Sequence, residues 1–355
     1  MKLSKINFAG QKLYVGIDVH ARQWKVTART MNTVLQTLSI NPSPIDLSKY
    51  LNKRYPGAEY STVYEAGFCG FWIHRQLVAS GIKNIVVNPA DIPTAHKEKD
   101  RKTDKIDSRK LARELSKDNL TGIDIPSENA QHLRSLCRSR FKNRQNINRV
   151  QNRIKAHLHL NGIKMPERSD MSHWSARFIA WLEKVEFSHQ SGRDCLDIYI
   201  EELQQSRKRL LKILRLLRGY AKQAYLKPTF ELFYSVPGIG FITAITFFTE
   251  LMDIKRFRSF DHLASYVGLV PSISSSDEKK SGKESMTNRK NFYLRYLIIE
   301  SAWVARRKDP VLLAKYEELC KRMKTQDAIV RIAKKLLRRL HYVWLNQEPY
   351  AIGVD

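Results

Sequence analysis

Four acidic residues in the N-terminal third have the types and positions of a metal site. Asp18 ends one strand-like apolar segment and Glu65 ends another, while Asp104 and Asp107 are three residues apart in a segment with helical periodicity. Residues three apart share one face of a helix. Carboxylate oxygens are ligands that Mg²⁺ prefers, and a bound metal can activate a nucleophile that attacks a phosphodiester. Each acid alone could simply balance nearby basic residues, but the set of four favours a metal site.

A second candidate site is a segment rich in serine and lysine at residues 272–285. A serine that attacks phosphate must lose its proton and needs positive charge around the pentacovalent oxygens. The segment offers both kinds of group: Ser272, Ser274, Ser275, Ser276, Ser281 and Ser285 among Lys279, Lys280 and Lys283, with Arg289 and Arg295 downstream. A polar surface loop without a catalytic role has the same composition, so composition alone does not decide between the two interpretations.

The charge of the chain points to a polyanionic partner. The 355 residues include 62 Lys and Arg against 35 Asp and Glu, which leaves a formal net charge of +27. So many positive charges repel one another in a compact fold unless a polyanion neutralises some of them. We therefore expect the protein to bind nucleic acid. No apolar run approaches the ~20 residues of a spanning helix, and the four separated cysteines form no zinc or disulfide motif. We therefore expect a soluble, cytoplasmic protein without membrane contact.

The elements that must position the acids follow the order of an α/β domain. Patterns of β-branched and apolar residues predict strands at residues 12–19, 24–30, 34–40, 61–65 and 85–87. A helix is expected at residues 71–80, and another begins near Thr103. A meander of three strands followed by strand, helix and strand is the order of an RNase-H-type sheet.

The rest of the chain is predicted to be helical. Residues 128–160 carry apolar side chains three and four apart, and a later segment repeats leucine every seven residues at Leu196, Leu203, Leu210 and Leu217. These two long helices suggest an antiparallel coiled-coil arm. Apolar segments at 241–252 and 292–305 and a basic helical tail follow. We expect three parts: an α/β domain at 1–125, a coiled-coil helical arm at 126–227 and a mainly helical domain at 228–355.

Read in order, these segments resemble the transposases of DEDD-type insertion sequences. The resemblance of the N-terminal part rests on residues 14–20 (YVGIDVH), 64–66 (YEA), 86–89 (VVNP) and 102–107 (KTDKID). That of the C-terminal part rests on residues 235–240 (SVPGIG), 266–271 (YVGLVP) and 293–295 (YLR). It covers nearly the whole chain and implies a RuvC-like N-terminal domain, the helical arm and a C-terminal serine transposase domain.

The same resemblance implies an RNA-guided recombinase. Family members work with a structured guide RNA from their own element, the bridge RNA, which pairs donor and target DNA. They cut and rejoin DNA through a phosphoserine link, with divalent metal, Mg²⁺ or Mn²⁺, at the DEDD acids. Position by position, these acids correspond to Asp18, Glu65, Asp104 and Asp107, and the serine, five residues after the proline of the 266–271 motif, corresponds to Ser276.

The serine segment departs from the family pattern in three places. Asp277 stands where the family usually has Gly, and Asn288 and Lys290 stand where it commonly has Lys and Gly. These departures leave Ser275 and Ser281 as alternative nucleophiles. An inactive copy of the enzyme is also compatible with them.

Candidate phosphate contacts lie on the arm and around the serine segment. The basic residues of the arm, Arg138, Arg149 and Arg153, lie off the apolar stripe, so we expect them to bind phosphates without supporting the fold. Lys279, Lys280 and Arg295 belong to the serine region. The arm and the separation of the acids from the serine favour a homo-oligomer, a dimer or a tetramer. The alternatives are a metal-dependent junction endonuclease that uses water, or a non-catalytic nucleic-acid-binding protein.

Overall fold

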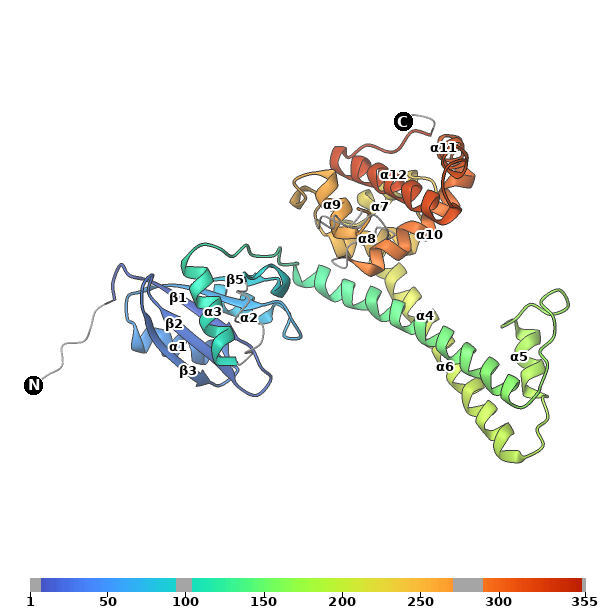
Figure 1. Cartoon of the computed structure of the whole chain (residues 1–355), viewed down its shortest axis with the longest axis horizontal. Helices are drawn as coiled ribbons and strands as arrows, with labels where there is room; N and C mark the ends of the chain where they lie inside the picture. The colour runs from blue at the N-terminus through green and yellow to red at the C-terminus, as the bar shows by residue number, and fades with distance from the viewer. Residues whose placement is uncertain (1–7, 94–103, 271–289, 353–355) are drawn as a thin grey trace, which may run out of the picture. The chain divides into compact units, whose positions relative to one another are not determined.

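The computed structural model describes residues 8–93, 104–270 and 290–352 (Figure 1). The chain divides into two compact units, Met1–Ile125 and Pro126–Asp355. The second unit contains both the helical arm and the C-terminal helices. Within the described ranges, none of the helices is long and apolar enough to cross a membrane.

A mixed five-stranded sheet is the centre of the first unit. Its strands are β1 (Lys12–Asp18), β2 (Trp24–Arg29), β3 (Val34–Ile40), β4 (Glu59–Glu65) and β5 (Lys83–Val87). Their order in the sheet is β3-β2-β1-β4-β5. The three strands of the meander are antiparallel, whereas β4 runs parallel to both β1 and β5. All five predicted strands are therefore confirmed, with bounds that differ by at most two residues.

Helices cover both faces of this sheet. On one face, α1 (Pro44–Arg54) and α2 (Trp72–Ala79) pack against alternate residues of β1, with Val15 and Ile17 in a shared core. On the other face lies α3 (Asp104–Ser116). Because the central strands are buried on both sides, they read as almost continuous apolar runs. A short 3₁₀ helix, Pro89–Asp91, follows β5.

The arm consists of two long helices that pack side by side, α4 (Glu128–Leu160) and α6 (Gln190–Ala221), with α5 (Ala176–Glu183) near one end (Figure 1). The pairing is antiparallel, because Arg153 contacts Glu202 while His157, one turn later, contacts the carbonyl of Gly192. One stretch of their contact is apolar, with Ile147, Val150, Ile154 and Leu158 of α4 and Leu196, Ile200 and Leu203 of α6. Beyond it the contact is polar, because the buried side-chain amide of Asn143 donates to the carbonyl of Ser206 at 2.9 Å. The predicted bounds of α4 are confirmed.

The C-terminal part of the second unit is entirely helical over the residues described. Its helices are α7 (Lys227–Ser235), α8 (Phe241–Leu251), α9 (Phe260–Val267), α10 (Phe292–Lys308), α11 (Pro310–Cys320) and α12 (Thr325–Asn346), with a 3₁₀ helix at Ile254–Arg256. Their core includes Leu133 and Cys137 from the start of α4 and Leu217 from the end of α6. The arm is thus continuous with this core, which explains why the two parts form one compact unit.

Candidate functional site

Asp18 and Glu65 lie at the ends of two neighbouring parallel strands. Asp18 is the last residue of β1 and Glu65 the last of β4. The two strands pair in parallel with Ile17 opposite Tyr64. The residues that follow, Asp18 and Glu65, are therefore side by side at the carboxyl edge of the sheet.

Both carboxylates belong to the face of the sheet that α3 covers. Side chains alternate between faces along a strand, so Asp18 shares the face of Gly16 and Glu65 shares the face of Val63. Val63 packs against Leu111 of α3. A Cβ atom on Gly16 would lie 2.2 Å from the carbonyl oxygen of Ser108, so only glycine allows this close approach of the helix.

The first turn of α3 carries the two other predicted acids. The helix begins at Asp104, and half-buried Asp107 comes directly before Ser108, whose hydroxyl lies 2.9 Å from that of Thr27 on β2. The side chain of Asp104 lies outside the described residues. Among the side chains that are described, no three His, Cys, Asp or Glu come close enough together to hold a metal. The carboxylate of Asp18 instead has the ring of His20 as a neighbour, 3.1 Å from its Nε2.

Residues 271–289, called the serine segment below, include Ser276, Lys279 and Lys280 and lie outside the described residues. The residues that flank this segment on either side are close together in the second unit. Gly268 ends α9 with a φ of +85°, and a Cβ there would lie 2.4 Å from the Cβ of Lys290. The N–H of Asn291 donates to the carbonyl of Tyr266 at 2.9 Å. Arg295 donates to the carbonyl of Gly268. The chain therefore leaves and re-enters the domain at one place.

A buried carboxylate, Glu250 of α8, organises this place. Its side chain has no exposed surface and accepts two hydrogen bonds from Arg138 of α4, at 2.7 and 2.8 Å. Asn291 donates its side-chain amide to the same carboxylate at 3.1 Å. Arg134 lies 3.9 Å away and donates to the carbonyl of Thr249. Glu250 thus ties α4 and α8 to Asn291, the residue directly before α10.

The charges around Glu250 are unequal. Two guanidinium groups face one carboxylate, and the hydrogen bond to Glu250 raises the pKa of Arg138. Burial lowers the pKa of Arg134, an effect that the charge of Glu250 partly opposes. Burial also lowers the pKa of Arg295. The Nη2 atom of Arg134 is buried and has no hydrogen-bond partner among the described residues. This guanidinium group could therefore donate a further hydrogen bond close to Glu250.

These contacts predict that Arg138→Gln destabilises the protein, whereas Arg149→Gln does not. Arg138 neutralises a fully buried carboxylate, and loss of such a partner should lower the free energy of unfolding by about 2 kcal/mol. Arg149, on the same helix, is exposed, and its replacement should change that free energy by less than ~0.5 kcal/mol. Urea unfolding of both variants measures the difference. Equal stability of the two variants would show that the ion pair with Glu250 does not support the fold.

The structure revises the expectation that the three basic residues of the arm only contact solvent or phosphate. Arg138 supports the fold through Glu250. Arg153 is exposed but pairs with Glu202 at 2.8 Å. Arg149 keeps the expected exposed position. Arg295 is half-buried rather than freely exposed, because its guanidinium binds the Gly268 carbonyl.

Sequence reasoning missed Glu250 and Asn291. Both are polar residues next to apolar helical segments, and Glu250 is the only acid in the apolar stretch 241–252. A single carboxylate in an otherwise apolar helix is a signal for a buried ion pair. Its partner, more than a hundred residues earlier in α4, could not be found from local spacing.

The chain is similar to known families in both units. Residues 15–162 match a family model described as a transposase of DEDD type from IS110 elements. Residues 230–317 match the model of the transposase IS116/IS110/IS902 family. The first match includes Asp18, Glu65, Asp104 and Asp107, and the second includes Glu250 and Ser276.

Individual relatives carry the same description. The transposase for insertion sequence element IS1533 of Leptospira borgpetersenii is 26% identical over 347 residues, which cover 96% of this chain and 97% of the relative. The putative transposase y4qE of Sinorhizobium fredii is 29% identical over 68% of this chain and 58% of its own length. The transposase for insertion sequence element IS1111A of Coxiella burnetii is 23% identical over 66% of this chain and 63% of its own length.

Proposed function

We propose that this chain, which belongs to the IS110/IS116 family of transposases, cuts DNA at the ends of an insertion sequence and rejoins it through a covalent serine intermediate. The observation that carries the proposal is the pair of strand-end carboxylates, Asp18 and Glu65, on the face of the sheet where α3 begins. Acids in this arrangement suit phosphodiester chemistry assisted by a divalent metal.

The strand order supports a RuvC-like, RNase-H-type identity for the first unit. A meander of three antiparallel strands is followed by two parallel strands joined through α2, and the central strand β1 carries the first acid. Helix α3 then returns across β1 with two further acids in its first turn. We infer that this unit is the nuclease-type domain of the enzyme.

Divalent metal, Mg²⁺ or Mn²⁺, fits the donor set of Asp18 and Glu65. Both supply carboxylate oxygens at the open end of a strand, and neither is fully buried. We propose that Asp104 and Asp107 complete the set. When bound, the metal would polarise the scissile phosphate and stabilise the leaving oxygen. His20, beside Asp18, would orient that carboxylate by its hydrogen bond.

Ser276 is the proposed nucleophile of the second unit. Its Oγ would give up its proton and attack the scissile phosphorus, and the bond from phosphorus to the leaving deoxyribose oxygen would break. That oxygen would take up a proton, so the step has no net gain or loss of protons. The new Oγ–phosphorus ester keeps the energy of the phosphodiester, so a deoxyribose hydroxyl can reverse the step and rejoin a strand. The support from this chain is the arginine-rich place where the ends of residues 271–289 meet, which suits the charge of a pentacovalent phosphate.

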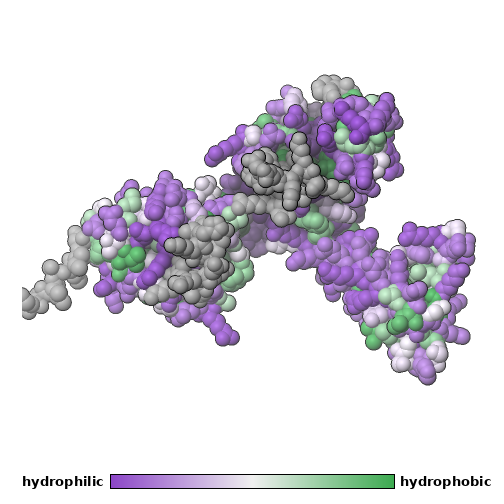
Figure 2. All heavy atoms as spheres, in the orientation of Figure 1, coloured by the Kyte–Doolittle hydropathy of each residue, from purple (hydrophilic) through white to green (hydrophobic). Residues whose placement is uncertain are grey.

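We also propose that a structured RNA from the same element guides the enzyme to donor and target DNA, and that it acts as a homo-oligomer. The net charge of +27 supports a large nucleic-acid partner. In the face of the molecule shown in Figure 2, hydrophilic residues cover most of the arm. Lys142, Arg144 and Arg149 are exposed residues of α4.

The test of the function is a covalent adduct. Purified protein is mixed with Mg²⁺, DNA that carries the element ends and RNA transcribed from the element, and the products are separated under denaturing conditions. A protein–DNA adduct supports the serine mechanism. Cleavage without an adduct would favour the junction endonuclease that uses water, and binding without cleavage would favour a non-catalytic protein.

Replacement of Lys142, Arg144 and Arg149 together by Gln should flatten the salt dependence of RNA binding. Each phosphate contact contributes about 0.7–0.9 to the slope of log affinity against log salt concentration, so loss of three contacts lowers the slope by about 2. Because the three side chains are exposed, the variant should unfold at the same urea concentration as the wild type. Fluorescence titrations at several salt concentrations measure the slope. An unchanged slope would show that these three side chains contact only solvent.

A further inference from the structure

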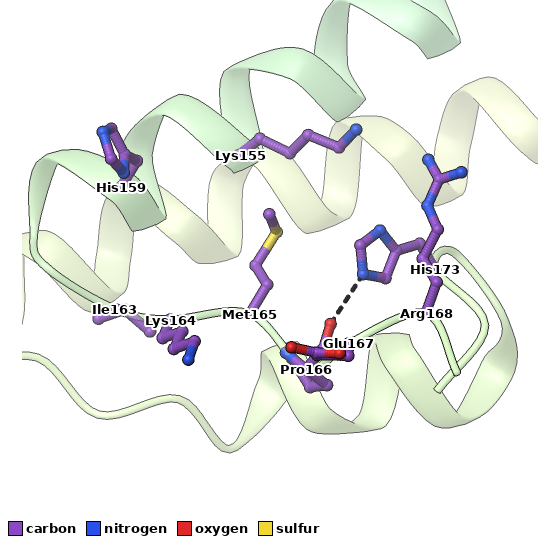
Figure 3. A pocket seen from close by; sticks show the side chains of 9 residues that line it. All are labelled: Lys155, His159, Ile163, Lys164, Met165, Pro166, Glu167, Arg168 and His173. Carbon is purple, nitrogen blue, oxygen red and sulfur yellow. Dashed lines mark hydrogen bonds between the residues drawn. The ribbon is translucent and has the colours of Figure 1, made fainter. Parts of the chain in front are cut away.

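The end of the arm carries a hollow that the proposed reaction does not use. Its volume is about 450 Å³, and it lies where α4 ends and the following loop leads toward α5. Lys155 and His159 of α4 line one side of it, while residues 163–168 and His173 line the other (Figure 3).

The charges around this hollow favour an anion. Three cationic side chains line it, Lys155, Lys164 and Arg168, against one carboxylate, Glu167. Figure 3 shows the Lys155 ammonium, the Arg168 guanidinium and the ring of His173 toward the same side, with Lys164 directed away from them. Lys155 also lies 5.8 Å from the ring of Trp174. The side that combines Lys155 with Arg168 is therefore suited to a phosphate group.

His173 offers a second kind of contact. Its Nε2 lies 3.0 Å from the carbonyl of Pro166, and a carbonyl only accepts, so Nε2 carries the proton and donates it. In the neutral ring the other nitrogen, Nδ1, is then an acceptor. Nδ1 is buried and has no hydrogen-bond partner in the part of the chain that the structure describes. A ligand with both a phosphate and an N–H or O–H donor would satisfy it.

The remaining lining is apolar. Ile163, Met165 and Pro166 belong to it, and the side chain of Met165 extends into the middle of the hollow in Figure 3. Methionine adapts its shape to flat rings and makes favourable contacts between sulfur and aromatic groups. The hollow thus has a surface for a planar, weakly polar group beside the cationic side.

We propose that this hollow binds one nucleotide of an unpaired nucleic-acid strand. The phosphate contacts Lys155 and Arg168, the base lies on Met165, and an N–H or O–H of the nucleotide donates to Nδ1 of His173. A base within a duplex is stacked on both sides and cannot enter, so the site selects single strands. The inference rests on nucleic acid as the partner, as in the proposed function, but it does not require strand cleavage.

The test compares two double variants that remove the same charge. Lys155→Gln/Arg168→Gln should bind a fluorescent ten-nucleotide oligothymidine or oligouridine about tenfold more weakly than the wild type at 0.15 M salt, because two phosphate contacts are lost. Lys49→Gln/Lys53→Gln, on exposed positions of α1, should lose much less affinity. Glu167→Gln should strengthen binding, since it removes the carboxylate of the hollow. Equal losses in the two double variants, or no gain in Glu167→Gln, would overturn the proposal.

Photocrosslinking locates the contact and identifies its source. An oligonucleotide with 4-thiouridine or 4-thiothymidine should crosslink to a peptide that contains Met165, and a ten-base-pair duplex should not. Stronger crosslinking by the ribose form would assign the site to RNA, and stronger crosslinking by the deoxyribose form would assign it to DNA. Crosslinks confined to other peptides would contradict the site. The outcome is independent of the proposed reaction, because these probes report binding whether or not element-end DNA is cleaved.

Discussion

Glu65→Gln is expected to abolish DNA cleavage without loss of DNA binding or of the fold. Glu65 ends β4 beside Asp18 and is only partly buried, so an amide of the same size fits its position. The amide removes one anionic oxygen from the proposed metal site, and we expect cleavage of element-end DNA to fall at least about 100-fold. A cleavage assay at several Mg²⁺ concentrations, together with a gel-shift assay, measures the two properties separately.

Glu59→Gln is the matched control, because Glu59 begins the same strand. The side chain of Glu59 is 57% exposed, and its carboxylate lies 4.0 Å from the ammonium group of Lys83. Its replacement should leave both cleavage and binding at the wild-type level. Asp18→Asn should behave like Glu65→Gln. If Glu65→Gln retained full activity at low Mg²⁺, the metal site would have to be assigned to other residues.

The strands and the long helices could be predicted because each carries a strong local pattern. The strand at 34–40 is rich in β-branched and apolar residues, and α4 has apolar residues three and four apart from Ile147 to Leu158, so both were predicted with the bounds observed. The shorter helices α1, α5, α7, α9 and α11 were not predicted. Each has too few turns for a clear period and is fixed by packing on neighbouring elements.

That Asp18 and Glu65 are neighbours could be established only from the register of the sheet. The sequence places both acids at strand ends, but only the parallel pairing of β1 with β4 shows that the two ends are adjacent. The role of Gly16 is also tertiary, since it depends on the backbone of α3. The hydrogen-bond partners of Glu250 could not be predicted from local sequence either, because they come from α4 and from the start of α10. Local patterns identified which residues could do chemistry, and long-range packing decides which of them meet.

Ser276→Ala is expected to remove the covalent protein–DNA adduct while the variant still binds DNA and RNA. A serine hydroxyl is a weak nucleophile by itself, so the hypothesis requires help from the carboxylate-bound metal and from nearby cations. The methyl group of alanine cannot form the ester, and adduct formation should fall by about 10⁴-fold or more. Denaturing gels with labelled element-end DNA detect the adduct, and gel shifts under native conditions report assembly of the complex.

Ser275→Ala and Ser281→Ala are the controls, since both residues belong to the same segment. Each should form the adduct at a rate close to that of the wild type. If Ser276→Ala keeps the adduct and one of the other two loses it, the nucleophile is that other serine, and Asp277 shifts the register relative to the family pattern. If all three variants form the adduct, the nucleophile lies outside the segment. A metal-dependent nick without any adduct in the wild type would instead mean that water attacks, because only a nucleophile that belongs to the protein keeps the DNA end attached after denaturation.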